Sequence, residues 1–278
     1  MYAVKSVFDS GWMEARSLTF TGRDLRLAEF LRPEDRRSLI VEMDGGLMLG
    51  PVQGLVKLGE ALERAGGADA VVLTLGQIKR VYGRLRGRAA PAPIIRADWT
   101  NMLRGEDHAL PALDVKHVMV AEAEDIALSG AAAGAVFFLV GYDRDRDEAK
   151  NMEDVARLAR GCAELSIPLL VQAIPFGPRI TKENLFDCIS MAARMALEAG
   201  ADVVAAPYPG SSKLLRELVD SIRAPLLLWD RGYDAEKLKD LCREAVDSGA
   251  AGMMVGEGLF KNPDWPERLR ILEGLIHK

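Results

Sequence analysis

The feature that most constrains the fold of this chain is the regular recurrence of short apolar runs. Eight of them occur, at residues 38–44, 68–74, 92–98, 133–142, 167–175, 201–209, 224–232 and 250–258. They are rich in Val, Ile and Leu without polar alternation, which is typical of strands buried on both faces of a parallel sheet. Stretches between them, such as 151–166, 181–200 and 234–249, space their apolar residues three and four apart, as amphipathic helices do.

A weak internal repeat accompanies this alternation. Small Gly-Ala corners precede four of the runs, in "AGGADAVVL", "SGAAAGAVFF", "EAGADVVAA" and "DSGAAGMMVG". Glycine can end a helix in the left-handed conformation, and small residues let a helix lie close to a strand. Eight strands alternating with helices predict an α/β fold, a (β/α)8 TIM barrel. A doubly wound open sheet is the alternative, but no GxGxxG motif follows the first run. We expect one domain over residues 1–278, with 1–37 as an N-terminal extension or cap.

Charge and cysteine content narrow the class of protein. The net charge of −5 argues against a broad nucleic-acid surface. Cys162, Cys188 and Cys242 are far apart and lack CxxC spacing, which favours reduced thiols over a disulfide framework or a zinc site. The first residues lack the layout of a signal peptide, and no apolar run approaches the roughly 20 residues that span a bilayer. We expect a cytoplasmic protein that acts on a small molecule, without nucleic-acid or membrane partners.

Barrel geometry indicates where to search for a site, because TIM-barrel active sites lie at the C-terminal strand ends. Polar residues at the predicted strand ends are Asp44, Arg96, Asp98, Tyr142, Gln172, Tyr208, Asp230, Arg231 and Glu257. Acidic groups that converge in one mouth suit proton transfer or metal binding. The alternative is that some of these charges are solvated or pair with Arg96 and Arg231. His108 and His117 have no third histidine nearby, which disfavours a zinc site of histidines.

Five segments of the chain resemble a known family in order and spacing. They are "SLIVEMDGGLMLGPVQGL", "GGADAVVLTLGQIKR", "IPLLVQAIPFGPRI", "GADVVAAPYPG" and "SGAAGMMVGEGLF", and together they cover roughly residues 38–262. The pattern is similar to the class I aldolases that include archaeal-type fructose-bisphosphate aldolases, deoxyribose-phosphate aldolase relatives and the autoinducer-processing thiolase. The resemblance implies a barrel with lyase activity in carbohydrate metabolism and a homo-oligomer.

The resemblance also implies three catalytic positions that this chain has changed. The family's Schiff-base lysine falls on Ala205, which cannot form an imine. Its proton-shuttling tyrosine falls on Ile174, and its histidine after "MD" falls on Gly45. Asp44 and Tyr208 remain as the retained polar groups. The resemblance therefore implies a site that has lost its electron sink.

The predicted phosphate end differs from the family pattern as well. "WDRG" at 229–232 and "GEG" at 256–258 stand where the family has "GGP" and "GRN". Carboxylates at Asp230 and Glu257 would repel a phosphate dianion unless Arg231 or a cation intervenes. Gly256 and Gly258 still allow a nest of backbone N–H groups. We therefore expect a substrate other than an ordinary sugar bisphosphate.

Three hypotheses for function follow. The first is an aldolase-like carbon–carbon lyase or transferase that acts on a small keto or sugar-derived metabolite without a Schiff-base lysine. Its predicted catalytic residues are Asp44, Asp98, Gln172 and Tyr208, and its predicted substrate-binding residues are Arg96, Asp230, Arg231, Gly256, Glu257 and Gly258. The second is an enzyme in which Asp44, Asp98, Asp230 and Glu257 hold Mg²⁺ or Mn²⁺. The third is a catalytically silent, metabolite-binding barrel, which the enrichment of acids at the strand ends disfavours.

Overall fold

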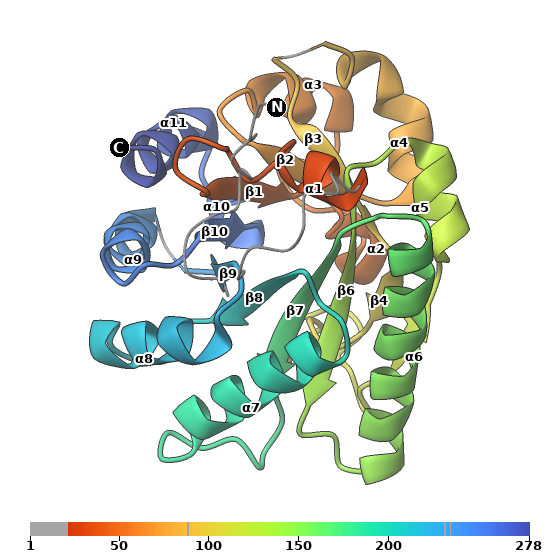
Figure 1. Ribbon diagram of the computed structural model, residues 1–278, viewed down its shortest axis with the longest axis vertical. Coiled ribbons are helices and arrows are strands. Elements are labelled where there is room, and N and C mark those ends of the chain that lie inside the picture. The colour runs from red at the N-terminus through yellow and green to blue at the C-terminus, as the bar shows by residue number, and fades with distance from the viewer. Residues whose placement is uncertain (1–21, 88, 231, 234) are drawn as a thin grey trace, which may run out of the picture.

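The computed structural model describes residues 22–278 except 88, 231 and 234. Eight of the described strands form a closed parallel barrel, and each pairs with its neighbours in chain order until the last returns to the first. They are β1 (Ser38–Glu42), β2 (Ala70–Leu73), β3 (Ala92–Arg96), β6 (Ala133–Val140), β7 (Leu169–Pro175), β8 (Val203–Pro207), β9 (Leu226–Trp229) and β10 (Gly252–Val255). The predicted (β/α)8 barrel is confirmed, and each strand lies within one of the eight apolar runs (Figure 1).

Helices follow the strands and surround the barrel (Figure 1). The described helices are α1 (Gly22–Leu27), α2 (Gly46–Leu49), α3 (Leu58–Arg64), α4 (Leu75–Val81), the 3-10 turn η1 (Tyr82–Arg84), α5 (Ala123–Ser129), α6 (Asp145–Glu164), α7 (Leu185–Glu198), α8 (Ser212–Ile222), α9 (Ala235–Asp247), α10 (Glu257–Phe260) and α11 (Trp265–Ile276). Their amphipathic spacing is visible in α7, whose buried residues include Ile189, Ala192, Ala193 and Ala196.

The Gly-Ala corners have the geometry that their sequence predicts. Gly130 ends α5 in the left-handed conformation, with φ of 73°. Gly252 has a φ of 118°, and a Cβ at this position would lie 2.0 Å from the carbonyl oxygen of Ser38 on the adjacent strand. Glycine at position 252 is therefore what lets β10 approach β1 and close the barrel.

Two buried clusters follow from the alternation of side chains along each strand. One fills the layer between the strands and the helices, and in β8 it includes Val204 and Ala206. The other fills the barrel interior, and in the same strand it includes Val203 and Ala205. The side of the sheet that a residue occupies therefore decides whether it can reach the barrel mouth.

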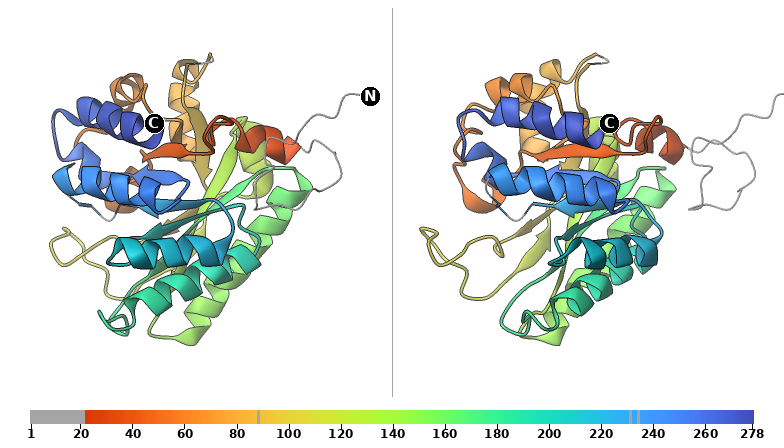
Figure 2. Two further views of the ribbon diagram at one scale, coloured as in Figure 1. Left: turned by 60° about the vertical axis from the view of Figure 1, so that its left-hand side comes forward. Right: turned by 90° about the vertical axis from the view of Figure 1, so that its left-hand side faces the viewer.

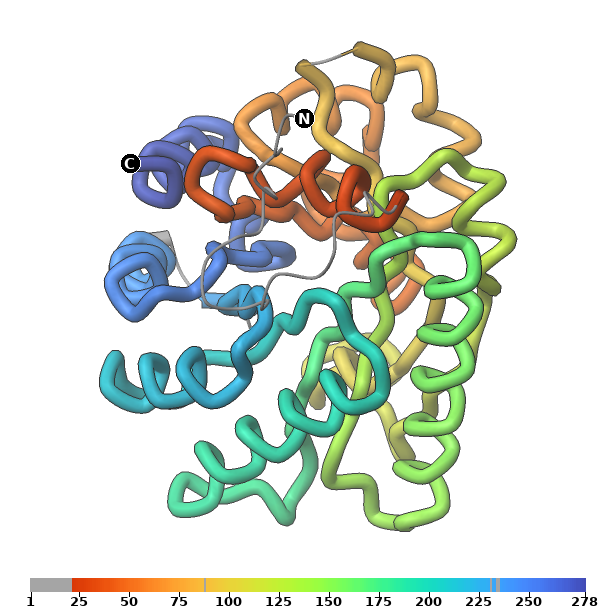
Figure 3. The backbone as a smooth tube through the Cα atoms, viewed as in Figure 1, coloured from red at the N-terminus to blue at the C-terminus, as the bar shows by residue number. Residues whose placement is uncertain are grey.

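The segment that precedes β1 covers the N-terminal end of the barrel. Leu27, Phe30 and Leu31 are buried together with the inward-facing strand residues. Arg26 donates a 2.8 Å hydrogen bond to the carbonyl of Ser166, just before β7. Residues 28–37 continue beside α11, where Arg37 donates a 2.8 Å bond to the carbonyl of Ile276 (Figure 3). The mouth at the other end of the barrel is left for the site.

An excursion between β3 and α5 was not predicted. The run 92–98 is not one continuous strand, because β3 ends at Arg96 and a separate hairpin begins. This hairpin consists of β4 (Asp98–Thr100) and β5 (His117–Met119), which pair antiparallel. Its loop projects at the end of the barrel opposite α1 (Figure 2). The loop is tied to the residues after β1, since Arg104 Nε donates a 2.8 Å bond to the carbonyl of Met48.

In the described part of the chain, no helix has both the length and the apolar character needed to cross a membrane.

Candidate active site

The end of β1 directs two carboxylates into the barrel. Leu39, Val41 and Met43 belong to the outer cluster, so the alternate residues Glu42 and Asp44 face inward. Asp44 is buried, with 1% of its surface exposed, and the Glu42 side chain is 13% exposed. Both line the same cavity at the mouth. The predicted inward position of Asp44 is correct, and Glu42 accompanies it.

Arg96 at the end of β3 is the buried cation between these acids. Its Nε lies 2.6 Å from Asp44 Oδ2, and its terminal nitrogens lie 3.4 Å from Glu42 and 3.5 Å from Asp98. The guanidinium stacks 4.0 Å from the ring centroid of Phe137. Burial alone would lower the pKa of Arg96, but the three carboxylates outweigh it and hold this pKa above its ordinary value. Arg96 therefore stays charged and fixes the acids around it.

Gln172 on β7 connects the arginine to the glutamate. Its carbonyl oxygen accepts a short hydrogen bond from Arg96, and its Nε2 donates a 2.9 Å bond to Glu42 Oε1. The register of the sheet sets Gln172 beside Ala205 of β8. Ala205 is fully buried and faces inward, and none of the described lysine side chains is buried or lines the cavity. Gln172 thus orients Glu42 without itself lining the cavity.

Glu42 has the most perturbed acidity in the cavity. Burial, followed by the charge of Asp44, raises its pKa to about 7. Arg96, the indole N–H of Trp229 and Gln172 oppose this rise. Trp229 Nε1 donates a 2.8 Å bond to Glu42 Oε2, which leaves the carboxyl held at both oxygens. A carboxyl with this pKa occupies its acid and its base form near neutral pH, as a proton-transfer group requires.

Asp98 does not line the cavity, and its contacts join the β4–β5 hairpin to the barrel. It belongs to β4, not to the third barrel strand, and it is fully buried. Its Oδ2 accepts bonds from His117 Nε2 at 2.8 Å and from the backbone N–H of Phe137 at 2.7 Å. These contacts, together with Arg96, join the β4–β5 hairpin to the barrel. Asp98 is therefore a supporting group in the described structure, and it does not line the cavity.

Tyr208 points away from the mouth. It lies two residues after Ala206, which belongs to the outer cluster. Because side chains alternate along a strand, Tyr208 faces the same side as Ala206, toward the helices. Its hydroxyl donates a 2.5 Å bond to Glu244 of α9. Burial and the bond to Glu244 raise the pKa of Tyr208, so the hydroxyl stays protonated. Tyr208 therefore does not line the cavity, and its part in catalysis stays a prediction that this position does not support.

The cavity itself has a volume of about 360 Å³. The apolar side chains that line it include Met48, Val52, Leu55, Met102, Ile174 and Phe176. Met102 comes from the loop after β4, so the unpredicted hairpin forms one wall. Ile174, where the family resemblance implies a tyrosine, lines the cavity without offering a proton. The cavity therefore combines apolar side chains with acidic groups.

The ends of β9 and β10 complete the mouth. Asp230 is buried and Glu257 is half exposed, and both line the cavity. Glu257 pairs with Lys261 at 3.2 Å. A Cβ at Gly256 would lie 2.9 Å from Glu42 Oε2, so this glycine makes room for the glutamate. Arg231, a predicted substrate-binding residue, lies outside the described residues.

The four predicted metal ligands are not gathered around one point. Asp44 and Asp98 are bonded to Arg96, Asp230 is bonded to backbone N–H groups, and Glu257 pairs with Lys261. Among the residues that the structure describes, no group of three or more His, Cys, Asp or Glu side chains is arranged to hold a metal ion. Asp44, Asp98 and Glu257 each pair with a cationic side chain of the protein, and backbone N–H groups orient Asp230, so the described side chains do not fit a shared Mg²⁺ or Mn²⁺ site.

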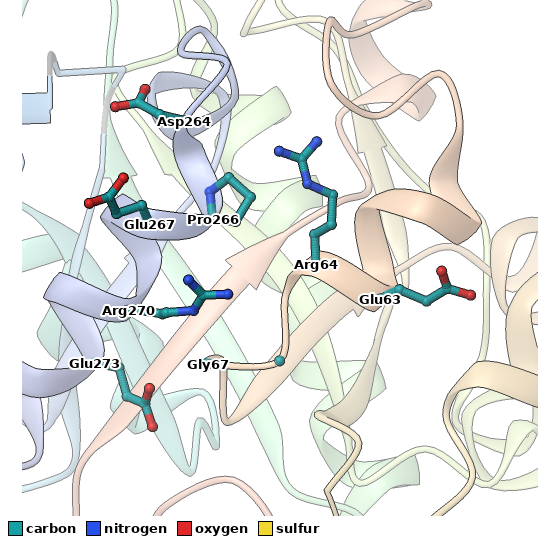
Figure 4. Close-up of a pocket in the computed structure, with 9 residues that line it drawn as sticks. Glu63, Arg64, Gly67, Asp264, Pro266, Glu267, Arg270 and Glu273 are labelled. Carbon is teal, nitrogen blue, oxygen red and sulfur yellow. The ribbon is translucent and has the colours of Figure 1, made fainter.

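A larger hollow, of about 600 Å³, lies in the outer layer between α3 and α11. Figure 4 shows residues of α11 on one side of it and Glu63, Arg64 and Gly67 on the other. Arg64 and Arg270 offset part of its acidic lining. Because the barrel mouth is lined by neither helix, this hollow is separate from the cluster around Arg96.

Comparison with known proteins identifies the family to which this barrel belongs. Residues 38–262 match the DeoC/LacD family aldolases. The chain belongs to this family. A 2-amino-3,7-dideoxy-D-threo-hept-6-ulosonate synthase of Halobacterium salinarum is 30% identical over 264 residues, which cover 94% of this chain and 93% of that protein. A class 1 fructose-bisphosphate aldolase of Thermoproteus tenax is 26% identical over 261 residues, covering 90% and 94%. These relatives carry the names of enzymes, so this chain is an enzyme of the lyase type.

The fold of the family is also seen in solved structures. An archaeal fructose-1,6-bisphosphate aldolase, with its catalytic lysine covalently bound to the carbinolamine intermediate, superimposes with a TM-score of 0.75. It shares 22% sequence identity, and the match covers 91% of this chain and 99% of that one. This likeness supports the fold of the present barrel.

Sequence reasoning missed two residues of the site, Glu42 and Trp229. Glu42 lies two residues before Asp44, and Trp229 directly precedes Asp230, so each lies close to a predicted site residue. The signal was present in "SLIVEMD", because inward-facing Asp44 implies that the residue two positions earlier also faces inward. The same alternation puts Trp229 on the inner face of β9. Assigning every second residue of each strand to the inner face would have identified both residues.

Proposed function

We propose that the protein makes or breaks a carbon–carbon bond of a small keto or sugar-derived metabolite by acid–base catalysis, without a lysine imine. The observation that carries the proposal is Glu42, a cavity carboxyl with a pKa raised to about 7 beside the Asp44–Arg96 pair. Membership of an aldolase family supports the reaction type. Ala205, at the position where the family resemblance implies the imine lysine, supports the lysine-free route.

The proposed cleavage begins at a β-hydroxy carbonyl compound. Asp44, whose carboxylate pairs with Arg96 at 2.6 Å, accepts the proton of the β-hydroxyl group. The carbon–carbon bond then breaks, and its electron pair moves toward the carbonyl as an enolate. Glu42 in its acid form donates a hydrogen bond, and then its proton, to the developing enolate oxygen. Condensation is the reverse of these steps.

The surroundings of Glu42 support this role. A buried, uncharged acid stabilises an oxyanion more strongly than the same acid in water, because the effective dielectric around it is lower, and the Glu42 side chain is only 13% exposed. Trp229 and Gln172 hold the two oxygens of Glu42 at 2.8 and 2.9 Å, which limits the reorganisation needed during the reaction. Arg96 lies beneath the acids and compensates the charge that develops above it.

Turnover assays with matched variants test the proposal. A panel of β-hydroxy ketones and keto-sugar compounds is followed by NMR for aldehyde and ketone products. Glu42→Gln is expected to lower turnover by about 10²–10⁴-fold, the usual contribution of a general acid–base group. Glu267→Gln removes an exposed carboxylate of the α3–α11 hollow and serves as the control. Equal turnover of wild type and Glu42→Gln on every accepted substrate would refute the proposed role.

The metal-assisted alternative is tested in the same assay. The arrangement of the described carboxylates gives no reason to expect a dependence on Mg²⁺ or Mn²⁺. We expect equal rates with a chelator and with either ion. A rate that falls with chelator and returns with one ion would instead favour that alternative. The homo-oligomer implied by the family resemblance stays a prediction, and light scattering after size-exclusion chromatography measures it.

A further inference from the structure

The described charged groups that line the cavity at the barrel mouth all have the same sign. They are Glu42, Asp44, Asp230 and Glu257. Among the described residues that line it, no Lys, Arg or His occurs. Arg96 is buried and does not line the cavity, and its guanidinium is already shared among three carboxylates. The described surface that a substrate meets is therefore acidic or apolar.

Asp230 provides the second observation. It follows β9 and is 4% exposed, and it lines the cavity. Its Oδ1 accepts two 2.8 Å bonds, from the backbone N–H groups of Gly232 and Tyr233, which fix the direction of the carboxylate. Its Oδ2 is buried without a hydrogen-bond partner in the described structure. Since a buried acceptor without a partner is costly, a donor on a bound molecule is the natural complement.

The glycines near Asp230 serve carboxylates in this chain. A Cβ at Gly258 would lie 2.8 Å from Asp230 Oδ2 and 2.6 Å from the carbonyl oxygen of Tyr233. Gly256 has the corresponding relation to Glu42. At both positions, the absence of a side chain leaves space for a carboxylate. A phosphate dianion at this corner would meet negative charge within a few ångströms, where the repulsion is weakly screened.

The walls complete the description of the substrate. Phe176, Trp229 and Phe260 line the cavity, and Trp229 is the residue before Asp230. Aromatic faces attract ammonium groups and exclude water from alkyl chains. An ammonium group also neutralises a surface whose described charges are all negative, which a hydroxyl group would not do.

We propose that the substrate is an amine-bearing carbonyl compound with a short non-polar chain, whose ammonium group binds Asp230 at the β9–β10 end of the cavity. Glu257 contributes a second negative charge at the mouth. Its own ion pair with Lys261 is half exposed and therefore weak. The carbonyl group of this substrate is inferred from the proposed function. Its ammonium group is inferred from the residues of the cavity alone.

Binding of simple probes tests this inference without any turnover. Wild-type protein is titrated by calorimetry with hexylamine, 1-hexanol and hexyl phosphate, which share one chain and differ in the end group. We expect hexylamine to bind at least about 10-fold more tightly than 1-hexanol, and hexyl phosphate to bind more weakly than either. Hexyl phosphate as the tightest ligand, or equal binding of all three, would overturn the inference.

Variants then locate the ammonium group. Asp230→Asn keeps the Oδ1 acceptor and is expected to lower hexylamine affinity about 10-fold or more, with 1-hexanol unchanged. Glu257→Gln changes a half-exposed position and is expected to lower hexylamine affinity by a smaller factor. This variant replaces Asp230→Asn as the test if Asp230→Asn does not fold. Glu267→Gln is the matched control outside the cavity. Unchanged hexylamine affinity in both cavity variants would contradict the inference, whereas failure to find carbon–carbon cleavage would affect only the proposed function.

Discussion

Trp229 Nε1 donates a 2.8 Å hydrogen bond to Glu42 Oε2 and so joins β9 to β1 past the intervening strand β10. The bond is possible because Gly256, after β10, has no side chain; a Cβ there would lie 2.9 Å from the same oxygen. The indole N–H favours the charged form of Glu42, and burial favours the neutral form. The balance between them sets the acidity on which the proposed chemistry depends.

Trp229→Phe is predicted to move the pH dependence of the enzyme upward. The variant removes a donor that stabilises the Glu42 carboxylate, so the pKa of Glu42 rises further above 7. A hydrogen bond to a charged group contributes about 1.5–3 kcal/mol, which corresponds to a shift of about one to two pH units. The pH profile of kcat/KM measures it, with Trp99→Phe as the control. A profile that Trp229→Phe leaves in place would show that this bond does not tune the group.

Asp44→Asn is predicted to lower turnover by about 10²–10⁴-fold while the fold is kept, because Arg96 retains Glu42 and Asp98 as partners. The same change should shift the pH profile downward, since the Asp44 charge is one cause of the raised pKa of Glu42. Kinetics across pH, with circular dichroism as the check on folding, measure both effects. Near-normal turnover would leave Glu42 as the sole proton-transfer group.

No imine is expected to form with keto substrates. Ala205 cannot form one, and none of the described lysine side chains is buried or lines the cavity. Borohydride is added in the presence of keto-sugar phosphates, and the intact mass is then measured. The archaeal aldolase with the covalently bound lysine serves as the positive control. A substrate-dependent mass increase mapped to Lys213 or another lysine would contradict the lysine-free account.

A separate prediction concerns stability at the N-terminal end of the barrel. His277 lies between two carboxylates, with Nδ1 2.6 Å from Asp35 and Nε2 2.9 Å from Asp69. Burial lowers the pKa of His277, but the bonds to Asp69 and Asp35 outweigh it and raise the pKa above 6.5. Arg32, which contacts both Asp69 and Glu273, is the neighbouring cation.

The sign of the pH effect follows from that raised pKa. The stabilisation by His277 is fully present below its unfolded value of 6.5 and is lost as the pH rises through the higher folded value. His277→Gln should therefore lower Tm at pH 6 and have little effect at pH 9. Thermal scans of both proteins across this range give the difference in Tm at each pH. Because Glu42 is present in both proteins, its contribution cancels in this difference. A constant difference in Tm would contradict the prediction.

Most of the fold could be predicted from the sequence, because parallel strands buried on both faces leave uninterrupted apolar runs. The β4–β5 hairpin could not, since Asp98–Thr100 and His117–Met119 are three residues each and their pairing is non-local. The hairpin depends on Asp98, whose Oδ2 accepts bonds from His117 and from the backbone N–H of Phe137, both distant in sequence. No local pattern contains that information.

The two-residue alternation of side chains along a strand predicts part of the site. Asp44 and Arg96 face inward as expected, and the same alternation places Glu42 on the inner face as well. Tyr208 shows the opposite error, because a polar residue at a strand end was assigned to the mouth although its alternation carries it toward Glu244. The raised pKa of Glu42 could not be predicted from the sequence, because it depends on burial and on the distance to Asp44.

The most direct test of the account is the titration of Glu42 itself. The carboxyl carbon of Glu42 is labelled with ¹³C, assigned by comparison with Glu42→Gln, and followed by NMR from pH 3 to 9. We expect a midpoint near 7, because burial and the charge of Asp44 raise the pKa of Glu42 to about 7. A midpoint near the ordinary glutamate value of 4.5 would mean that Glu42 is a permanent carboxylate at neutral pH, which would contradict its role as the acid of the reaction.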